Sequence, residues 1–165
     1  MNQKILVAYA SRAGSTAEIA QAIGKVLEAQ GVVVDVLPVN AVTGVKDYRA
    51  VVIGSAVRYG QWLSEATKFV EKFRAELSGK PVAYFAAYLM NQGEDEVNRK
   101  ARQAYFAAAR GLVAPKAEAC FTGVGDMAKV ALFERIIGKL VKSPEGDFRD
   151  WNAIRAWAES LKTIL

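Results

Sequence analysis

The sequence contains no histidine and only one cysteine, Cys120, among its 165 residues. A lone cysteine excludes an intramolecular disulfide and any iron–sulfur or zinc site built from several thiolates. Without histidine, Ser–His–Asp and Cys–His catalysis and histidine-ligated metals are excluded as well. Demanding chemistry would therefore depend on a bound cofactor, and we predict neither a catalytic residue nor a metal site.

A long hydrophobic run and a secretory signal are also missing. No stretch approaches the roughly 18 uninterrupted apolar residues of a transmembrane helix, and the first residues lead directly into a strand-like segment. The hydrophobic content of 52% and the charged content of 24% are typical of a globular protein with a buried core. We therefore expect one cytoplasmic domain over residues 1–165.

The chain carries an excess of positive charge, with a formal net charge of +5 at pH 7. Such an excess is compatible with an ordinary solvated surface, and equally with attraction to anionic lipid, nucleic acid or an acidic partner. Charge alone does not choose among these. We predict no nucleic-acid partner.

Apolar runs alternate with helical periodicity along the chain. We predict strands over residues 4–9, 32–37, 50–53, 81–88 and 116–121, and helices over 17–30, from 64 onward, 94–110 and 150–165. This alternation predicts an α/β fold, a parallel sheet with helices on both faces. Ligands bind such sheets at the loops that leave the carboxyl ends of strands, which here follow Tyr9, Ile53 and Tyr88.

An additional amphipathic helix is predicted over residues 126–142, between the fifth strand and the last helix. One face is apolar, and Arg135, Lys139 and Lys142 cluster on the other. The apolar face could pack on the domain, or the basic flank could rest on an anionic membrane. We favour packing on the domain, and peripheral contact with the inner face of the membrane is the alternative.

The loop after the first strand is rich in hydroxyl groups and small residues, Ser11 to Thr16. It lacks the lysine of a Walker A loop and the three glycines of a dinucleotide fingerprint. Gly54 and Ser55 end the third strand, where a phosphoacceptor domain would need an acidic residue. The amides and dipole of the following helix suit a phosphate dianion. Ser15 and Glu18 also have capping-box spacing, so helix capping is the competing explanation.

The two later loops carry aromatic and apolar side chains. The second loop has Tyr59 and Trp62 around Gly60, and the third runs from Ala87 to Met90. Flat apolar walls near a phosphate loop are typical of a site for a planar cofactor. By itself, Trp62 would more simply be a residue of the core.

Three segments resemble a known family. The loop from Tyr9 to Thr16 is similar to the FMN-phosphate signature of flavodoxins, with Ala13 where that signature usually has Ser or Thr. The segments 51–60 and 146–151 resemble the menaquinone-dependent protoporphyrinogen oxidase family. The resemblance implies a flavodoxin-like three-layer α/β sandwich with parallel strands in the order 2-1-3-4-5. It also implies FMN as cofactor, oxidation of a porphyrinogen and reduction of a membrane quinone.

The resemblance assigns the phosphate to the first loop and the flavin ring to the two later loops. The predicted cofactor-binding residues are Ser11, Arg12, Ala13, Gly14, Ser15, Thr16, Val57, Arg58, Tyr59, Gly60, Gln61, Trp62, Ala87, Tyr88, Leu89 and Met90.

Two functions fit this pattern. The first is an FMN-dependent oxidoreductase that acts on a small-molecule substrate or a redox protein partner, with a quinone as the implied acceptor. The second is a non-enzymatic electron carrier between redox proteins. A third hypothesis is an interaction module of the same fold that has lost its cofactor.

The net charge predicts a less negative reduction potential for the bound FMN than acidic flavodoxins have. One positive charge about 10 Å away in water-like dielectric stabilises the anionic reduced flavin by roughly 0.4 kcal/mol, or about 20 mV for one electron. Several positive charges together raise the potential further, and Arg12 and Arg58 are the first candidates. Potentiometric titration of the holoprotein measures this quantity, and a potential as low as that of acidic flavodoxins would contradict the prediction.

Overall fold

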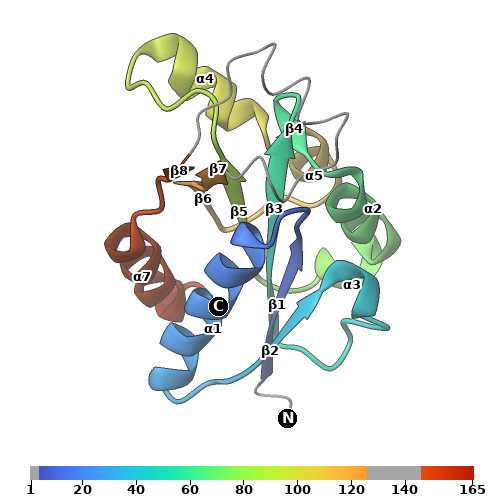
Figure 1. Cartoon of the computed structure of the whole chain (residues 1–165). Helices are drawn as coiled ribbons and strands as arrows, with labels where there is room; N and C mark the ends of the chain where they lie inside the picture. The colour runs from blue at the N-terminus through green and yellow to red at the C-terminus, as the bar shows by residue number, and fades with distance from the viewer. Residues whose placement is uncertain (1–3, 126–145) are drawn as a thin grey trace.

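The computed structural model describes residues 4–125 and 146–165, so the predicted helix over 126–142 lies outside the described residues. A parallel sheet in the order β2-β1-β3-β5-β6 forms the centre of the molecule (Figure 1). Its strands are β1 (Lys4–Ala10), β2 (Val33–Pro38), β3 (Ala50–Arg58), β5 (Val82–Tyr88) and β6 (Ala117–Thr122). Without the short strand β4 (Gln61–Trp62), this is the predicted order 2-1-3-4-5.

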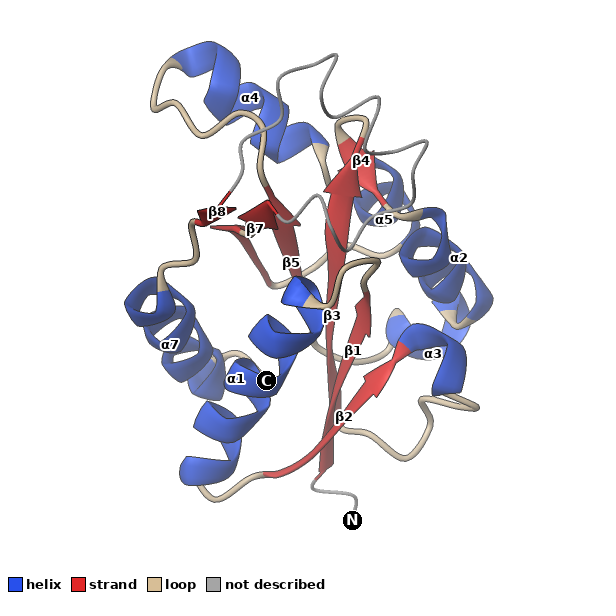
Figure 2. Cartoon of the chain, viewed as in Figure 1, coloured by secondary structure: helices blue, strands red, loops and turns tan. Residues whose placement is uncertain are grey.

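Helices cover both faces of this sheet, as predicted (Figure 2). On one face lie α1 (Ser15–Ala29) and α7 (Trp151–Ser160), and on the other α2 (Ser64–Lys72), α3 (Arg74–Leu77) and α5 (Ala107–Leu112). The remaining helices are α4 (Glu96–Ala104) and the short turns η1 (Val39–Ala41) and η3 (Leu161–Thr163). Within the described ranges, no helix has the length and apolar character needed to cross a bilayer.

Alternation along β1 shows how the sheet separates two apolar layers. Ile5 and Val7 face the core under α1 and α7, whereas Leu6 and Ala8 face the core under α2 and α5. Side chains of a strand point to opposite faces in turn, so a strand covered on both sides has an almost continuous apolar sequence. The helices therefore fix the sheet from both sides, and its carboxyl edge remains for the loops.

The third strand is longer than predicted, because it continues through Gly54 and Ser55 to Arg58. The ring of Phe85 on β5 lies directly against Gly54, where a side chain would collide with it. Glycine is therefore needed for close packing at this point and does not end the strand. Residues 56–62, predicted as a loop, form a β-hairpin instead, in which β4 pairs antiparallel with the end of β3.

The helix predicted over 94–110 is divided into α4 and α5. Tyr105 and Phe106 lie between the two helices, and both are 2% exposed. Both rings belong to the core under α2 and α5. The break between α4 and α5 thus coincides with two adjacent buried aromatic residues.

A second, two-stranded sheet returns the chain to the carboxyl edge of the main sheet. β7 (Val124–Gly125) pairs antiparallel with β8 (Gly146–Asp147). Just beyond β8, the amide of Phe148 donates to the carbonyl of Gly123 at 3.1 Å. The segment before α7 is thereby joined to the end of β6.

Replacing Gly54 tests the close packing between β3 and β5. A Cβ atom placed there would lie 1.9 Å from the nearest Phe85 ring carbon. We expect Gly54→Ala to lower the free energy of unfolding by about 1–3 kcal/mol, as overpacking of a core does. Urea unfolding measures the loss. The matched control is Gly44→Ala, since a Cβ at Gly44 has no atom within 4 Å, and equal losses in both variants would contradict the prediction.

Candidate cofactor site

The loop between β1 and α1 is a tight turn held by its own groups. Gly14 has φ +93°, a left-handed conformation that glycine adopts without steric cost. Its amide donates to Ser11 Oγ at 3.0 Å. The turn places Ser15 at the first position of α1, directly beyond the carboxyl end of β1.

The predicted capping box at this helix is wrong. Gly14 is the residue that precedes the helix, and no side chain of residues 4–125 and 146–165 caps it. Glu18 is bound elsewhere, because its carboxylate pairs with the guanidinium of Arg149. The first amides of a helix have no partner within the helix, and no side chain in these ranges supplies one. The explanation that competed with phosphate binding is therefore removed.

Thr16, at the start of α1, carries a buried hydroxyl group that a ligand at the loop could satisfy. Its side chain is fully buried, and Oγ1 has no hydrogen-bond partner among residues 4–125 and 146–165. Buried polar groups are almost always paired, so an unpaired one requires an explanation. A phosphate at the start of α1 would accept from this hydroxyl and from the helix amides. The residues present therefore fit an anionic phosphate group.

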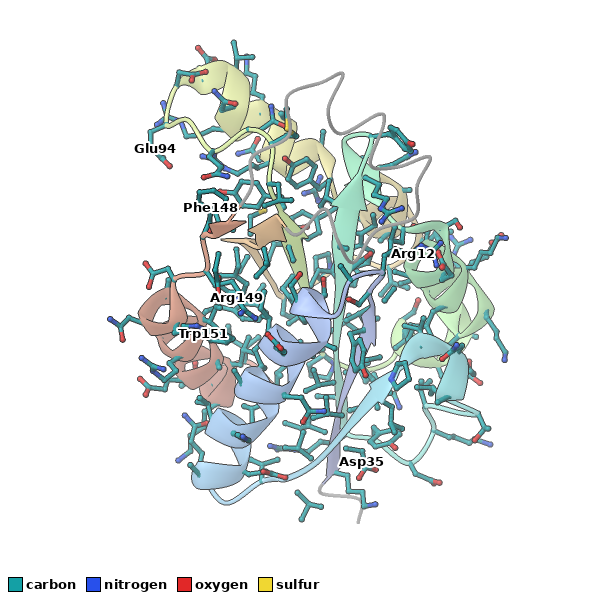
Figure 3. The ribbon with its side chains drawn as sticks, in the orientation of Figure 1. Arg12, Asp35, Glu94, Phe148, Arg149 and Trp151 are labelled. Carbon is teal, nitrogen blue, oxygen red and sulfur yellow. The ribbon has the colours of Figure 1, made fainter. Side chains whose placement is uncertain are left out.

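The charged residue of the loop points away from its centre. Arg12 Nη1 lies 2.5 Å from Glu65 Oε1 on α2, and Figure 3 shows Arg12 on this side of the molecule. Burial alone would raise the pKa of Glu65, but its hydrogen bonds and Arg12 together lower it. The pKa of Arg58 is lowered by burial and by the nearby charge of Arg12. The side chain of Arg12 is thus engaged by Glu65, which offsets part of its positive charge.

The second loop is the tight hairpin between β3 and β4. Val57 pairs with Trp62 and Arg58 with Gln61, which leaves Tyr59 and Gly60 as the turn. Both turn residues have positive φ, 51° and 74°, as a type I′ turn requires. Tyrosine is poorly suited to this conformation, yet its side chain stands 74% exposed at the tip. The hairpin therefore presents an aromatic ring at a position that favours asparagine or glycine.

Trp62, predicted to flank the flavin ring, is a core residue. It is 4% exposed, and its indole packs edge-on against the rings of Tyr84 and Phe106, at 4.9 and 5.6 Å between centroids. Because Trp62 lies opposite Val57 across the hairpin, it shares the face of Val57, which packs against the same core. The longer β3 thus turns this indole inward and leaves Tyr59 outside.

The third loop, like the second, combines buried and exposed side chains. Ala87 and Tyr88 are buried at the end of β5, and the Tyr88 ring lies 5.8 Å from that of Tyr105. Leu89 is half-buried and Met90 is 45% exposed. Tyr88, expected beside the flavin, is therefore part of the layer beneath, and the next two residues carry side chains toward the surface.

Sequence reasoning did not select Gly123, which joins three parts of the site. Its amide donates to the carbonyl of Tyr88 at 2.8 Å. A Cβ atom on Gly123 would lie 3.7 Å from Ser15 Oγ, so the end of β6 contacts the start of α1. The signal available in the sequence was a glycine immediately after a strand.

Arg149 was also missed, and it fixes the segment before α7 to the first turn of α1. Its guanidinium pairs with Glu18 and Asp147 and lies 4.6 Å from the centre of the Trp151 ring (Figure 3). Hydrogen bonds from Arg149 lower the pKa of Asp147 to about 2, and the same pairing raises the pKa of Arg149. The neighbouring Asp150 caps α7 by accepting from Ala153. The segment 146–151, quoted above for its resemblance, is therefore built into the wall of the site.

Three exposed hydrophobic side chains follow the carboxyl ends of different strands. Tyr59 follows β3, Met90 follows β5, and Phe148, 37% exposed, is bonded through its amide to the residue after β6. We name these three residues the apolar rim. Because β3, β5 and β6 are parallel neighbours, the apolar rim lies at the same sheet edge as the phosphate loop.

Comparison with known proteins is decisive for the family. A family model described as a flavodoxin domain matches residues 6–152. The chain belongs to the flavodoxin family. Membership of this family implies FMN as the cofactor, and the uncapped helix and unpaired Thr16 hydroxyl fit its phosphate. Residues 11–16 would hold that phosphate, and the hairpin and the third loop would lie along the ring.

Curated relatives of this flavodoxin domain include two proteins named protoporphyrinogen IX dehydrogenase (quinone). The protein from Escherichia coli K12 is 33% identical over 89 residues, which are 53% of this chain and 49% of that relative. The alignment thus spans about half the length of each. The protein from Leishmania major is 23% identical over 176 residues, covering 98% of this chain and 75% of the relative.

Solved structures show the same fold at low identity. Oxidised flavodoxin 2 from Bacillus cereus has a TM-score of 0.63 and 20% identity, covering 98% of this chain and 99% of that chain. A flavodoxin from the domain Archaea has a TM-score of 0.60 and 20% identity, covering 97% of this chain and 96% of that chain.

Thr16→Val tests whether the buried hydroxyl serves the phosphate. We expect the free energy of unfolding of the apoprotein to rise by about 1 kcal/mol, since an unsatisfied buried hydroxyl is removed without loss of volume. The Kd of FMN should rise about tenfold, because a hydrogen bond to a charged group is lost, whereas that of riboflavin should not change. Fluorescence titration and urea unfolding measure both quantities. Thr67→Val on α2 is the control, and unchanged FMN affinity in Thr16→Val would refute the assignment.

Proposed function

We propose that the chain is an FMN-dependent oxidoreductase that oxidises a porphyrinogen-type substrate and reduces a quinone. The observation that carries this proposal is the similarity to curated proteins of that activity from two distant organisms, Escherichia coli and Leishmania major. The similarity to the Leishmania protein extends over 98% of this chain. These relatives supply the substrate class, and the chain itself supplies the site.

The apolar rim supports a substrate that is flat and largely apolar. Tyr59, Met90 and Phe148 are exposed although each is large and hydrophobic. Large exposed apolar groups at a ligand-binding edge of the sheet favour an interaction with another apolar surface. Tyr59 also retains an unfavourable backbone conformation, with φ 51°. Strain of this kind is concentrated at functional positions, so we assign Tyr59 to substrate contact.

The chain positions the reactants and excludes water, while bound FMN supplies the electron transfer. The start of α1 holds the cofactor by its phosphate, and the buried rings of Trp62 and Tyr88 support the hairpin and the third loop from beneath. Each oxidation step removes two electrons and two protons from the substrate, and one quinone accepts them to become a quinol; complete oxidation to the porphyrin repeats this step with further quinone. The reaction therefore needs no other oxidant or reductant.

A carrier of electrons between proteins is the second candidate. It is favoured by the near-complete alignment with flavodoxin 2 from Bacillus cereus, which covers 98% of this chain and 99% of that protein. A carrier would exchange electrons with protein partners and leave porphyrinogen unchanged. Turnover of the small molecule therefore separates the two functions.

Anaerobic mixing of the holoprotein with protoporphyrinogen and a soluble menaquinone analogue tests the proposal. We expect porphyrin fluorescence to increase when FMN and quinone are both present, and not to increase when either is omitted. Porphyrin formation no faster than without protein would favour the carrier.

Tyr59→Ala tests the apolar rim in the same assay. We expect kcat/KM for the porphyrinogen to fall about tenfold, as loss of an aromatic contact of about 1–1.5 kcal/mol predicts. The control is Val33→Ala, which shortens an exposed side chain at the opposite edge of the sheet, where β2 begins. The assignment of Tyr59 fails if both variants retain wild-type kcat/KM.

A further inference from the structure

The loop from Leu89 to Asp95, between β5 and α4, is held by side chains that approach it from the helix layer. We name it the β5–α4 loop. Arg102 Nη1 donates to the carbonyls of Asn91 and Gly93, at 2.5 and 2.7 Å. The hydroxyl of Tyr105 lies 3.3 Å from the carbonyl of Met90. Three of the loop's carbonyls are thereby directed toward α4 and the turn that follows it.

Side-chain contacts fix the sharpest bend of this loop. Asn91 has φ +63°, a left-handed conformation that asparagine tolerates better than most residues. Its amide group donates to Asn98 of α4 at 3.2 Å, and its Oδ1 accepts from Tyr105 at 3.0 Å. The bend is therefore specified by contacts from α4 as well as by the local sequence.

Arg102 is placed to act as the centre of these contacts. Its side chain is only 13% exposed, and its guanidinium lies 5.8 Å from the centre of the Tyr88 ring. Glu94, at the far end of the loop, pairs with it at 3.5 Å. The partly buried guanidinium of Arg102 thus joins the middle and the far end of the β5–α4 loop to the last residue of β5.

The anchored carbonyls also determine where the amides of the loop point. A trans peptide places its carbonyl oxygen and its N–H on opposite sides. The amides of Asn91, Gln92 and Glu94 therefore point away from α4, and none of them donates a hydrogen bond within the described part of the chain. They remain available to acceptor atoms of a ligand that lies against the loop.

From this geometry we infer that Arg102 is a positioning residue for the flavin ring. By binding two carbonyls of the β5–α4 loop, it holds Leu89, Met90 and the free loop amides in one arrangement. The inference rests on the proposed placement of the ring beside this loop, and is independent of the porphyrinogen activity. A neutral side chain at this position would release the loop while the phosphate loop stays intact.

Arg102→Gln is the direct test, with flavin binding to the apoprotein as the readout. We expect the Kd values of both FMN and riboflavin to rise about tenfold, since charge-assisted hydrogen bonds that order the ring-binding loop are lost. Visible circular dichroism of the bound flavin should change as well, because its surroundings are altered. A variant of the phosphate loop would weaken FMN alone, so the two sites are distinguishable.

Arg110→Gln is the matched control. Arg110 lies on the adjacent helix α5, contacts an aromatic ring in a similar way, and binds Glu118 through two hydrogen bonds of 2.8 Å. It touches no residue of the β5–α4 loop. We expect this variant to keep the wild-type affinities for both flavins, even if its unfolding free energy falls. Equal weakening by Arg110→Gln would overturn the inference.

Two milder variants decide the question should Arg102→Gln not fold. Arg102→Lys keeps the positive charge but loses the planar guanidinium group that binds two carbonyls. Tyr105→Phe removes only the hydroxyl that contacts Met90 and Asn91. We expect both to weaken FMN and riboflavin in parallel, by less than tenfold. Wild-type affinity for riboflavin together with an unchanged flavin spectrum in these variants would overturn the role of Arg102.

Discussion

The start of α1 is the constraint on which the site depends. Gly14 turns the chain from β1 into the helix, and within the described part of the chain no side chain caps the first turn. The helix dipole and its unpaired amides create positive potential at this point. Thr16 adds a buried hydroxyl without a partner in the described residues. An anionic group at this end of the helix would satisfy donors that the fold leaves open, so cofactor binding and local stability are coupled.

The walls of the site are built in two layers. In an inner layer of aromatic rings, Trp62 of the hairpin packs edge-on against Tyr84 and Phe106. An outer layer, the apolar rim, remains exposed. Edge-to-face packing restricts the orientation of the inner rings, so the hairpin and the β5–α4 loop start from rigid supports. This division separates residues that hold the loops from residues that are free to meet a ligand.

Periodicity was sufficient to predict the parallel sheet and the helices on both its faces, because the buried strands are almost continuously apolar, whereas the strand order came from the resemblance to flavodoxins. It could not show that β3 extends through Gly54, since the need for glycine comes from Phe85 on another strand. The inward orientation of Trp62 follows from that extension, and so was missed as well. The roles of Arg149 and Arg102 depend on partners distant in sequence, which no local pattern contains.

The pairing of β7 with β8 has a consequence for how this domain can vary. Gly125 and Gly146 are register partners in the two-stranded ladder, so these two residues lie side by side. A connection of almost any length can be accommodated between such points, because loop closure adds little cost as length increases. The ladder is therefore a natural insertion point, where accessory segments can be exchanged during evolution or engineering while the flavodoxin core keeps its geometry.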